Sequence, residues 1–248
     1  MVDLNKYFDK VCYINLEEDS KKKQYFETEI KKSVFLSEHC HRYDAVVGKY
    51  IDIRLIPDYI VTTKAKNDII EKKQKTYGIS LTYGSLACAL SHHLIYQECQ
   101  NSHKPFCVFE DDIIIDENFD HNLSLLLSTV QSKSYNYDII YLGYNEIPGF
   151  QKKIIDDVIS EPRGLITGLY GYIVSSGGAK KLLNTIFPLY KQIDSCISDQ
   201  RDKFDLLCAT TKFVQVRTDF GSKTQLDASC KNIHSQIDQY SEWYKLFQ

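Results

Sequence analysis

The sequence predicts an α/β fold in which a mostly parallel central sheet carries helices on both faces. Short apolar runs rich in β-branched and aromatic residues alternate with segments whose apolar residues recur at helical spacing. This alternation favours parallel strands joined by helical crossovers. At 248 residues, the chain is long enough to bury a full core.

The first part of the chain reads as strand, helix, strand and then an insertion. Residues 11–16 predict a short strand, and a lysine-rich segment with helical spacing follows it. Residues 41–48 predict a second strand that ends at glycine. Residues 49–80 are poorly periodic and include Pro57, so we expect an irregular insertion with short helices.

The central part repeats the same order of elements. Residues 82–100 keep an i, i+3, i+4 apolar pattern and predict a buried helix that Thr82 caps. A strand at 106–110, a helix at 119–130 and a strand at 137–144 are expected next. In such sheets the ligand crevice lies beyond the carboxyl ends of the strands.

The final elements are predicted as a strand at 172–174, a helix at 178–187, a short helical region at 193–207 and a last strand at 212–218. Ser175 or Ser176 is placed to cap the second of these. The tail from Asp219 onward is polar and is expected to wrap the surface. We therefore predict a single domain over residues 1–248.

Composition argues against some partners and suggests a compartment. The chain has 30 basic and 33 acidic residues, a formal charge of -3 and a pI near 6.2, which gives no overall attraction to nucleic acid or to an anionic membrane. The N-terminal apolar stretch is too short for a signal peptide, and no run reaches the length of a membrane helix. Eight cysteines without a CxxC pair suit a reducing compartment, so a cytoplasmic protein is expected.

Three consecutive carboxylates, Glu110, Asp111 and Asp112, follow the apolar run at 106–109. Like charges placed side by side repel, more so where the dielectric is low, so something should offset them. One interpretation is a divalent cation, because Mg²⁺ and Mn²⁺ are commonly held by one or two carboxylates together with phosphate oxygens. The alternative is a solvated turn.

Several familiar sites are missing from the sequence. It contains no GxGxxG or GxxxxGK[ST] loop and no GxSxG elbow, which argues against a standard NAD, P-loop or serine-hydrolase site. The histidines at 39–41 and 91–93 match no usual zinc spacing, and surface or core histidines are the preferred interpretation. Tyr141, Tyr170 and Tyr172 could stack on a sugar or a base, although core packing is the simpler use for each.

The chain resembles glycosyltransferase family 25 over residues 11–215, most of its length. The segments that carry the resemblance are, in order, VCYINL, RYDAVVG, GSLACALSHHLIYQ, PFCVFEDDIII, YDIIYLG, GYIVSSGGAKKLL and QID. This family includes lipopolysaccharide-biosynthesis galactosyltransferases and procollagen galactosyltransferases. The resemblance implies a GT-A type, Rossmann-like nucleotide-sugar transferase fold. It also implies Mn²⁺ (or Mg²⁺) bound through the EDD segment, a UDP-hexose donor and inversion of the anomeric centre. The acceptor would be a hydroxyl of a glycan, a lipopolysaccharide or a collagen-like hydroxylysine.

The resemblance also implies roles for individual residues. Asp112 with Asp111 or Glu110 would contact the metal, and Asn15 and Leu16 would lie beside the nucleotide. Ser91 and His92 match the family's helix motif and are assigned to cofactor binding. For His234 in the tail, two interpretations are open: a ligand that completes the metal shell, or a solvated histidine.

Asp194 matches the aspartate that follows the GAKKLL helix and is the preferred catalytic base, with Asp199 second. An N-cap role for Asp194 is an equally open interpretation from its position alone.

This chain departs from the family pattern at identifiable positions. The family commonly shows GEIGCALSH, whereas this chain has Ser85 in place of the glutamate and Ala87 in place of a glycine. Paired arginines after the first strand are replaced by lysines at 21–23, which keep the charge but lose the bidentate fork. A catalytically degenerate module that binds glycan or nucleotide is therefore one alternative function. A metal-dependent phosphohydrolase is a second alternative, but the sequence has no second carboxylate or histidine cluster at a usable spacing to support it.

Overall fold

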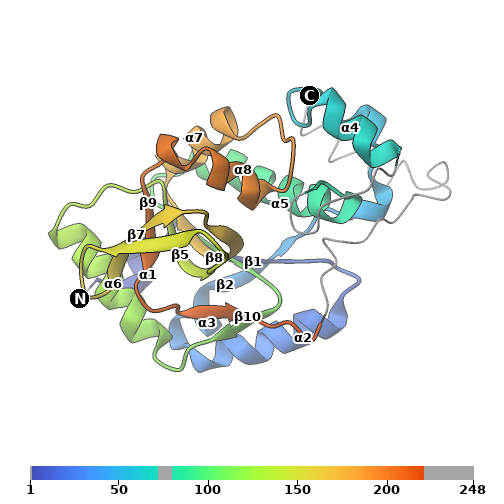
Figure 1. Cartoon of the computed structure of the whole chain (residues 1–248). Coiled ribbons are helices and arrows are strands. Elements are labelled where there is room, and N and C mark those ends of the chain that lie inside the picture. The colour runs from blue at the N-terminus through green and yellow to red at the C-terminus, as the bar shows by residue number, and fades with distance from the viewer. Residues whose placement is uncertain (1, 72–79, 221–248) are drawn as a thin grey trace.

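The computed structural model describes residues 2–71 and 80–220, and these residues form an eight-stranded mixed sheet (Figure 1). The strand order is β2-β1-β3-β8-β5-β9-β7-β6. The strands are β1 (Lys10–Asn15), β2 (Cys40–Asp44), β3 (Phe106–Glu110), β5 (Ile139–Asn145), β6 (Phe150–Ile154), β7 (Ile159–Gly164), β8 (Thr167–Val174) and β9 (Leu206–Ala209).

Most strands of this sheet run in one direction, as predicted. β1 pairs in parallel with both β2 and β3, and β5 pairs in parallel with β9. β8 lies antiparallel between β3 and β5, and β7 lies antiparallel between β9 and β6. Within the described residues, only β8 and β7 therefore run against the other six strands. The carboxyl ends of β1, β2 and β3 meet at one edge of the sheet.

Helices cover both faces of the sheet (Figure 1). One face carries α1 (Leu4–Tyr7), α2 (Ser20–Glu29), α3 (Val34–His39) and α6 (Phe119–Ser132). The other carries α5 (Tyr83–Cys99), α7 (Ser176–Thr185) and α8 (Ile193–Asp199), and its core also takes in α4 (Thr63–Ile70). Each face has its own buried apolar cluster, so the predicted α/β class is confirmed.

The two-residue period of the strands determines which core each side chain joins. Cys12 and Val108 pack in the cluster on the α5 face, whereas Tyr13 and Phe109 pack in the cluster on the α2 face. The pattern reaches the end of β3, where Glu110 lies on the α5 side. The residues that follow β3 then turn toward α2.

Two predicted elements near the C-terminus differ from the structure. The expected strand at 212–218 is β10 (Val214–Val216), which pairs outside the main sheet with β4 (Ile113–Ile115). The predicted helical region at 193–207 ends its α-helix at Asp199, and its last residues belong to β9. β9 forms because its apolar residues pair with β5 and become buried. Short-range helical spacing could not reveal that pairing.

The predicted caps and insertion are largely reproduced. Thr82 and Ser85 form a capping box at the start of α5, and Ser175 caps α7 through the Gly178 amide. The expected insertion contains two short 3-10 turns, Gly48–Tyr50 and Ile53–Leu55, and α4. Its residues 72–79 and the tail from 221 lie outside the described residues. No described helix has both the length and the apolar character needed to cross a bilayer.

Candidate functional site: two cavities that meet at Glu110

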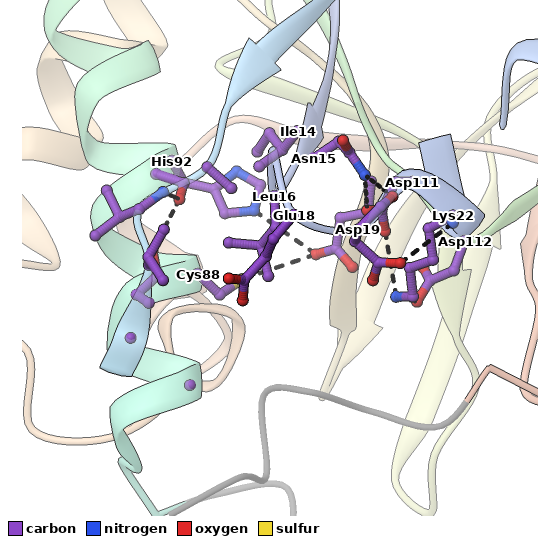
Figure 2. Close-up of a pocket in the computed structure, with 18 of the residues that line it drawn as sticks. Ile14, Asn15, Leu16, Glu18, Asp19, Lys22, Cys88, His92, Asp111 and Asp112 are labelled. Carbon is purple, nitrogen blue, oxygen red and sulfur yellow. Dashed lines mark hydrogen bonds and ion pairs between the residues drawn. The ribbon is translucent and has the colours of Figure 1, made fainter. Parts of the chain in front are cut away.

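A cavity of about 560 Å³ lies beyond the carboxyl ends of β1, β2 and β3 (Figure 2). We call it cavity A. Its polar lining comes from the ends of β1 and β3, from α2 and from α5. The residues that line the cavity include Asn15, Leu16, Lys22, Cys88, Ser91, His92, Glu110, Asp111, Asp112 and Arg217. The structure thus brings together every residue that the resemblance assigned to nucleotide and metal, apart from His234, which lies outside the described residues.

The carboxylates of Asp111 and Asp112 converge on one lysine. The Lys22 ammonium on α2 donates to Asp111 Oδ1 at 3.2 Å and to Asp112 Oδ2 at 2.7 Å, and all three side chains are largely buried. Because β3 ends at Glu110, the chain turns and both aspartates reach the same side. The crowded charge was expected to be offset by a cation or relieved in a solvated turn. The structure supplies a lysine.

Burial and charge act in opposite directions on these groups. Burial and the neighbouring Glu110 raise the pKa of Asp112 to about 6, against the lowering effect of Lys22. Burial also raises the pKa of Asp111, opposed by Lys22 and Asn15. Although burial lowers it, the two carboxylates together raise the pKa of Lys22. The lysine therefore stays charged and compensates the acidic turn only in part.

Asn15 completes the polar end of this cavity. Its Nδ2 donates to Asp111 Oδ2 at 2.7 Å, while its Oδ1 is buried without a hydrogen-bond partner. Asp112 Oδ1 is likewise buried and unpartnered. Each unpaired buried oxygen is costly unless a ligand or cation supplies a partner. Both oxygens could therefore accept a hydrogen bond from a ligand or coordinate a cation at this end of the cavity.

The opposite wall of cavity A is α5 (Figure 2). The Ser91 hydroxyl donates to the Ala87 carbonyl at 2.8 Å and accepts from the Val46 amide at 2.9 Å, which fixes the loop after β2. His92 is fully buried, and its Nδ1 lies 2.8 Å from the Tyr172 hydroxyl. Ser91 thus holds a loop in place, whereas His92 presents its second ring nitrogen toward Glu110.

A second cavity of about 560 Å³, which we call cavity B, lies against β8 and α8. Cys88, Glu110 and Val216 line both cavities, so the two spaces meet at this point. Asp194 and Asp199, the two candidate bases, both line cavity B. A small molecule in cavity A and another in cavity B would therefore meet beside Glu110.

Asp194 is held by backbone amides. Its Oδ2 accepts from the Gly168 amide at 3.0 Å and its Oδ1 from the Ser195 amide at 2.7 Å. Burial raises the pKa of Asp194, partly opposed by these two bonds. α8 begins at Ile193 with Gln192 as its N-cap, so Asp194 is a first-turn residue and the N-cap alternative is wrong.

Asp199 has a different environment in the same cavity. It accepts from the Tyr190 hydroxyl at 2.8 Å and pairs with the Lys191 ammonium at 2.6 Å. Although burial raises it, these two partners lower the pKa of Asp199 overall. Asp199 is therefore a weaker proton acceptor than Asp194.

Other candidates are placed as follows. Tyr141 and Tyr172 are core residues, and Tyr170 is buried but lines cavity B. Among the described residues, the metal-capable cluster contains His92 and neither His39 nor His41. Sequence reasoning missed Cys88 as a site residue and the pairing of Lys22 with the acidic turn. The sequence did contain a signal for Cys88, because Cys88 and His92 are four residues apart and so lie on one face of the helix.

Fold and site together define a protein with a Rossmann-like sheet, an acidic edge at its carboxyl end and two adjoining ligand cavities. A family model described as glycosyltransferase family 25 (LPS biosynthesis protein) matches residues 8–197. The chain therefore belongs to glycosyltransferase family 25.

The curated relatives include proteins named as galactosyltransferases and proteins named as inactive family members. Procollagen galactosyltransferase 1-A of Xenopus laevis is 30% identical over 205 residues, which cover 75% of this chain and 30% of that protein. Probable inactive glycosyltransferase 25 family member 3 of Bos taurus is 29% identical over 139 residues, covering 54% of this chain and 23% of that protein. The chain thus spans less than a third of these relatives.

Proposed function

We propose that this chain transfers a hexose, galactose or glucose, from a UDP-sugar to a hydroxyl of a glycan or hydroxylysine acceptor with inversion at the anomeric carbon. Family membership and relatives named galactosyltransferase support the reaction class. The observation that carries the proposal is the meeting of two cavities at Glu110, one with a charged acidic and lysine end and the other with Asp194. A donor and an acceptor need such adjoining spaces.

Cavity A is the proposed donor site. The polar end formed by Asn15, Lys22 and Asp112 faces the space where a nucleoside diphosphate would lie. A divalent cation fits here, because Asp112 Oδ1 and Asn15 Oδ1 are unpartnered hard oxygen atoms and Glu110 lines the same space. When bound, Mn²⁺ or Mg²⁺ would supply charge neutralisation for the departing diphosphate. Lys22 contributes a fixed positive charge at the same end.

Cavity B is the proposed acceptor site, and Asp194 is the proposed general base. Its raised pKa makes its carboxylate a better proton acceptor than an ordinary aspartate, and its two backbone bonds hold it in one orientation. In this proposal Asp194 accepts the proton from the attacking acceptor hydroxyl. Lys191 and Tyr190 hold Asp199 in place beside it.

The direct test is turnover of UDP-hexoses by the purified chain. With Mn²⁺ present, we expect slow hydrolysis of UDP-galactose or UDP-glucose without acceptor, and Asp112→Asn should abolish it. Asp156→Asn is a matched control, because Asp156 pairs with Lys133 outside both cavities. A donor and acceptor panel with mass analysis would identify the product. Full turnover by Asp112→Asn would remove that residue from the proposed donor site.

A binding module without turnover is the second candidate. Two observations favour it: relatives named inactive, and Ser85 in place of the family glutamate. Here Ser85 lines cavity B but is engaged in the capping box of α5. Calorimetric binding of UDP with no product over the whole acceptor panel would favour this function over the transferase.

A further inference from the structure

The junction of the two cavities carries a cluster of three side chains that differ in kind from the acidic turn. Cys88 and His92 lie on successive turns of α5, and Glu110 ends β3. Glu110 Oε1 is 3.7 Å from His92 Nε2 and 3.9 Å from Cys88 Sγ. One ligand atom from each of the three residues lies within 4.8 Å of the other two.

His92 points an unpartnered nitrogen into this cluster. The residue is fully buried, and its Nε2 has no hydrogen-bond partner among the residues that the structure describes, while Nδ1 lies 2.8 Å from the Tyr172 hydroxyl. In the tautomer in which Nδ1–H donates to the Tyr172 hydroxyl, Nε2 carries the lone pair and faces the cluster, and a bound metal would select this tautomer. A buried lone pair held toward a thiol and a carboxylate is the arrangement of a metal ligand.

The spacing also suits a common ion. Tetrahedral zinc bonds of about 2.0 to 2.3 Å place two ligand atoms about 3.3 to 3.8 Å apart. The observed separations of 3.7 and 3.9 Å need only small side-chain adjustments. All three residues line cavity A, and Cys88 and Glu110 also line cavity B, so a fourth position would face open space.

We propose that Cys88, His92 and Glu110 bind one transition-metal ion of the Zn²⁺ class, with a fourth coordination position open to the cavities. Thiolate and imidazole ligands favour Zn²⁺ and related ions over Mn²⁺ or Mg²⁺, which prefer oxygen. Binding displaces the Cys88 proton into solvent. The site shares Glu110 with the acidic segment, but its thiolate and imidazole ligands distinguish it from the turn at Asp111 and Asp112, and it does not depend on sugar transfer.

Cobalt substitution tests the proposal without any substrate. Metal-free protein, kept reduced with a phosphine, is titrated with Co²⁺ and then with Zn²⁺. We expect one equivalent of Co²⁺ to give a near-ultraviolet sulfur-to-cobalt band that Zn²⁺ abolishes. Cys88→Ser should lose the band and weaken Zn²⁺ binding at least about 10-fold.

Control variants at other cysteines test whether Cys88 supplies the thiolate ligand. Cys99→Ser changes a buried cysteine on the same helix, and Cys230→Ser changes one outside the described residues; both should keep the band. Circular dichroism checks the fold of each variant. If Cys88→Ser does not fold, Glu110→Gln serves instead, because its side chain is partly exposed; it should weaken Zn²⁺ binding yet keep the sulfur band.

Two outcomes would overturn the site. One is a folded wild-type protein that gives no sulfur-to-cobalt band at saturating Co²⁺. The other is evidence that a different cysteine supplies the thiolate. The sulfur-to-cobalt band would then survive in Cys88→Ser, or it would disappear in Cys230→Ser. Absence of UDP-sugar turnover would not contradict the metal site, because the cobalt titration contains no nucleotide.

Discussion

The two cavities hold their aspartates in different ways. In cavity A, Asp111 and Asp112 share the ammonium of one buried lysine. In cavity B, Asp194 rests on the amides of Gly168 and Ser195, which bring dipoles but no formal charge. Both cavities contain carboxyls with a raised pKa, yet only one of them has a cationic side chain bonded to those carboxyls.

The difference suggests a division of work between the cavities. A carboxylate held by a lysine is anchored as part of a charged surface, which suits a phosphate or a cation as ligand. Asp194 has no cationic partner within the described part of the chain, and although its two amide bonds favour the ionised form, burial outweighs them and raises its pKa, which suits a proton acceptor. Substitutions that remove one kind of support at a time can separate these roles.

The largest effect is expected for Asp194→Asn. Removal of a general base should lower turnover of a UDP-hexose with its acceptor by about 100- to 10,000-fold. Asp199→Asn should lower it by less than about 10-fold, since Lys191 and Tyr190 already engage that carboxylate and depress its pKa. Steady-state rates for both variants, with thermal unfolding as a check, give the comparison.

The pH dependence of hexose transfer tests whether Asp194 is the general base. Only the deprotonated form of Asp194 can act, so the rate should rise with pH through its raised pKa, above the ordinary value of about 4. Asp194→Asn should remove this acidic limb. Equal rates for wild type and Asp194→Asn at every pH would exclude the residue as base.

Lys22→Ala should give the largest loss of stability. The substitution leaves Asp111 and Asp112 buried without their cation, which typically costs about 3 to 5 kcal/mol. Lys23→Ala, on the next residue, removes an exposed pair with Glu27 at 3.9 Å and should cost less than about 0.5 kcal/mol. Urea unfolding measures both, and equal losses would mean that burial of the pair contributes nothing.

Asp112 should make stability depend on pH in an unusual direction. The pKa of Asp112 is about 6 in the folded protein, against about 4 in the unfolded chain. Between about pH 4 and pH 6, the folded state therefore binds more protons at this residue than the unfolded state does. Stability contributed by this group is therefore present at low pH and falls by about 2 to 3 kcal/mol as pH rises through that window. Unfolding free energies of wild type and Asp112→Asn from pH 4 to 7 should differ by this slope. A constant difference would contradict it.

The sequence predicted the sheet class and the crevice better than the site chemistry. Strand and helix periodicity, the Thr82 cap and the acidic residues after β3 were all readable locally. The antiparallel insertion of β8 was not, because pairing between distant segments leaves no local pattern. β9 was missed for the same reason.

Within the site, charge compensation was the part that the sequence could not show. Lys22 lies 89 positions from Asp111 along the chain, and only the parallel pairing of β1 with β3 brings α2 beside the acidic turn. The cluster of Cys88, His92 and Glu110 likewise joins a helix to a strand end. The family resemblance assigned His92 and Glu110 to the site, Cys88 was missed, and the fold brings all three together.

Among the residues that line the cavities, the smallest effect is expected for Lys191 in cavity B, which matches Lys22 in the distance to its aspartate but not in burial. Lys191 lies 2.6 Å from Asp199, whereas Lys22 lies 2.7 Å from Asp112. The side chains of the first pair are 20% and 36% exposed, against 9% and 14% for the second, so water can replace Lys191. Lys191→Ala should therefore cost less than about 1 kcal/mol in urea unfolding. A loss as large as that of Lys22→Ala would mean that distance, and not burial, sets the strength of these pairs, and the contrast between the two cavities would fail.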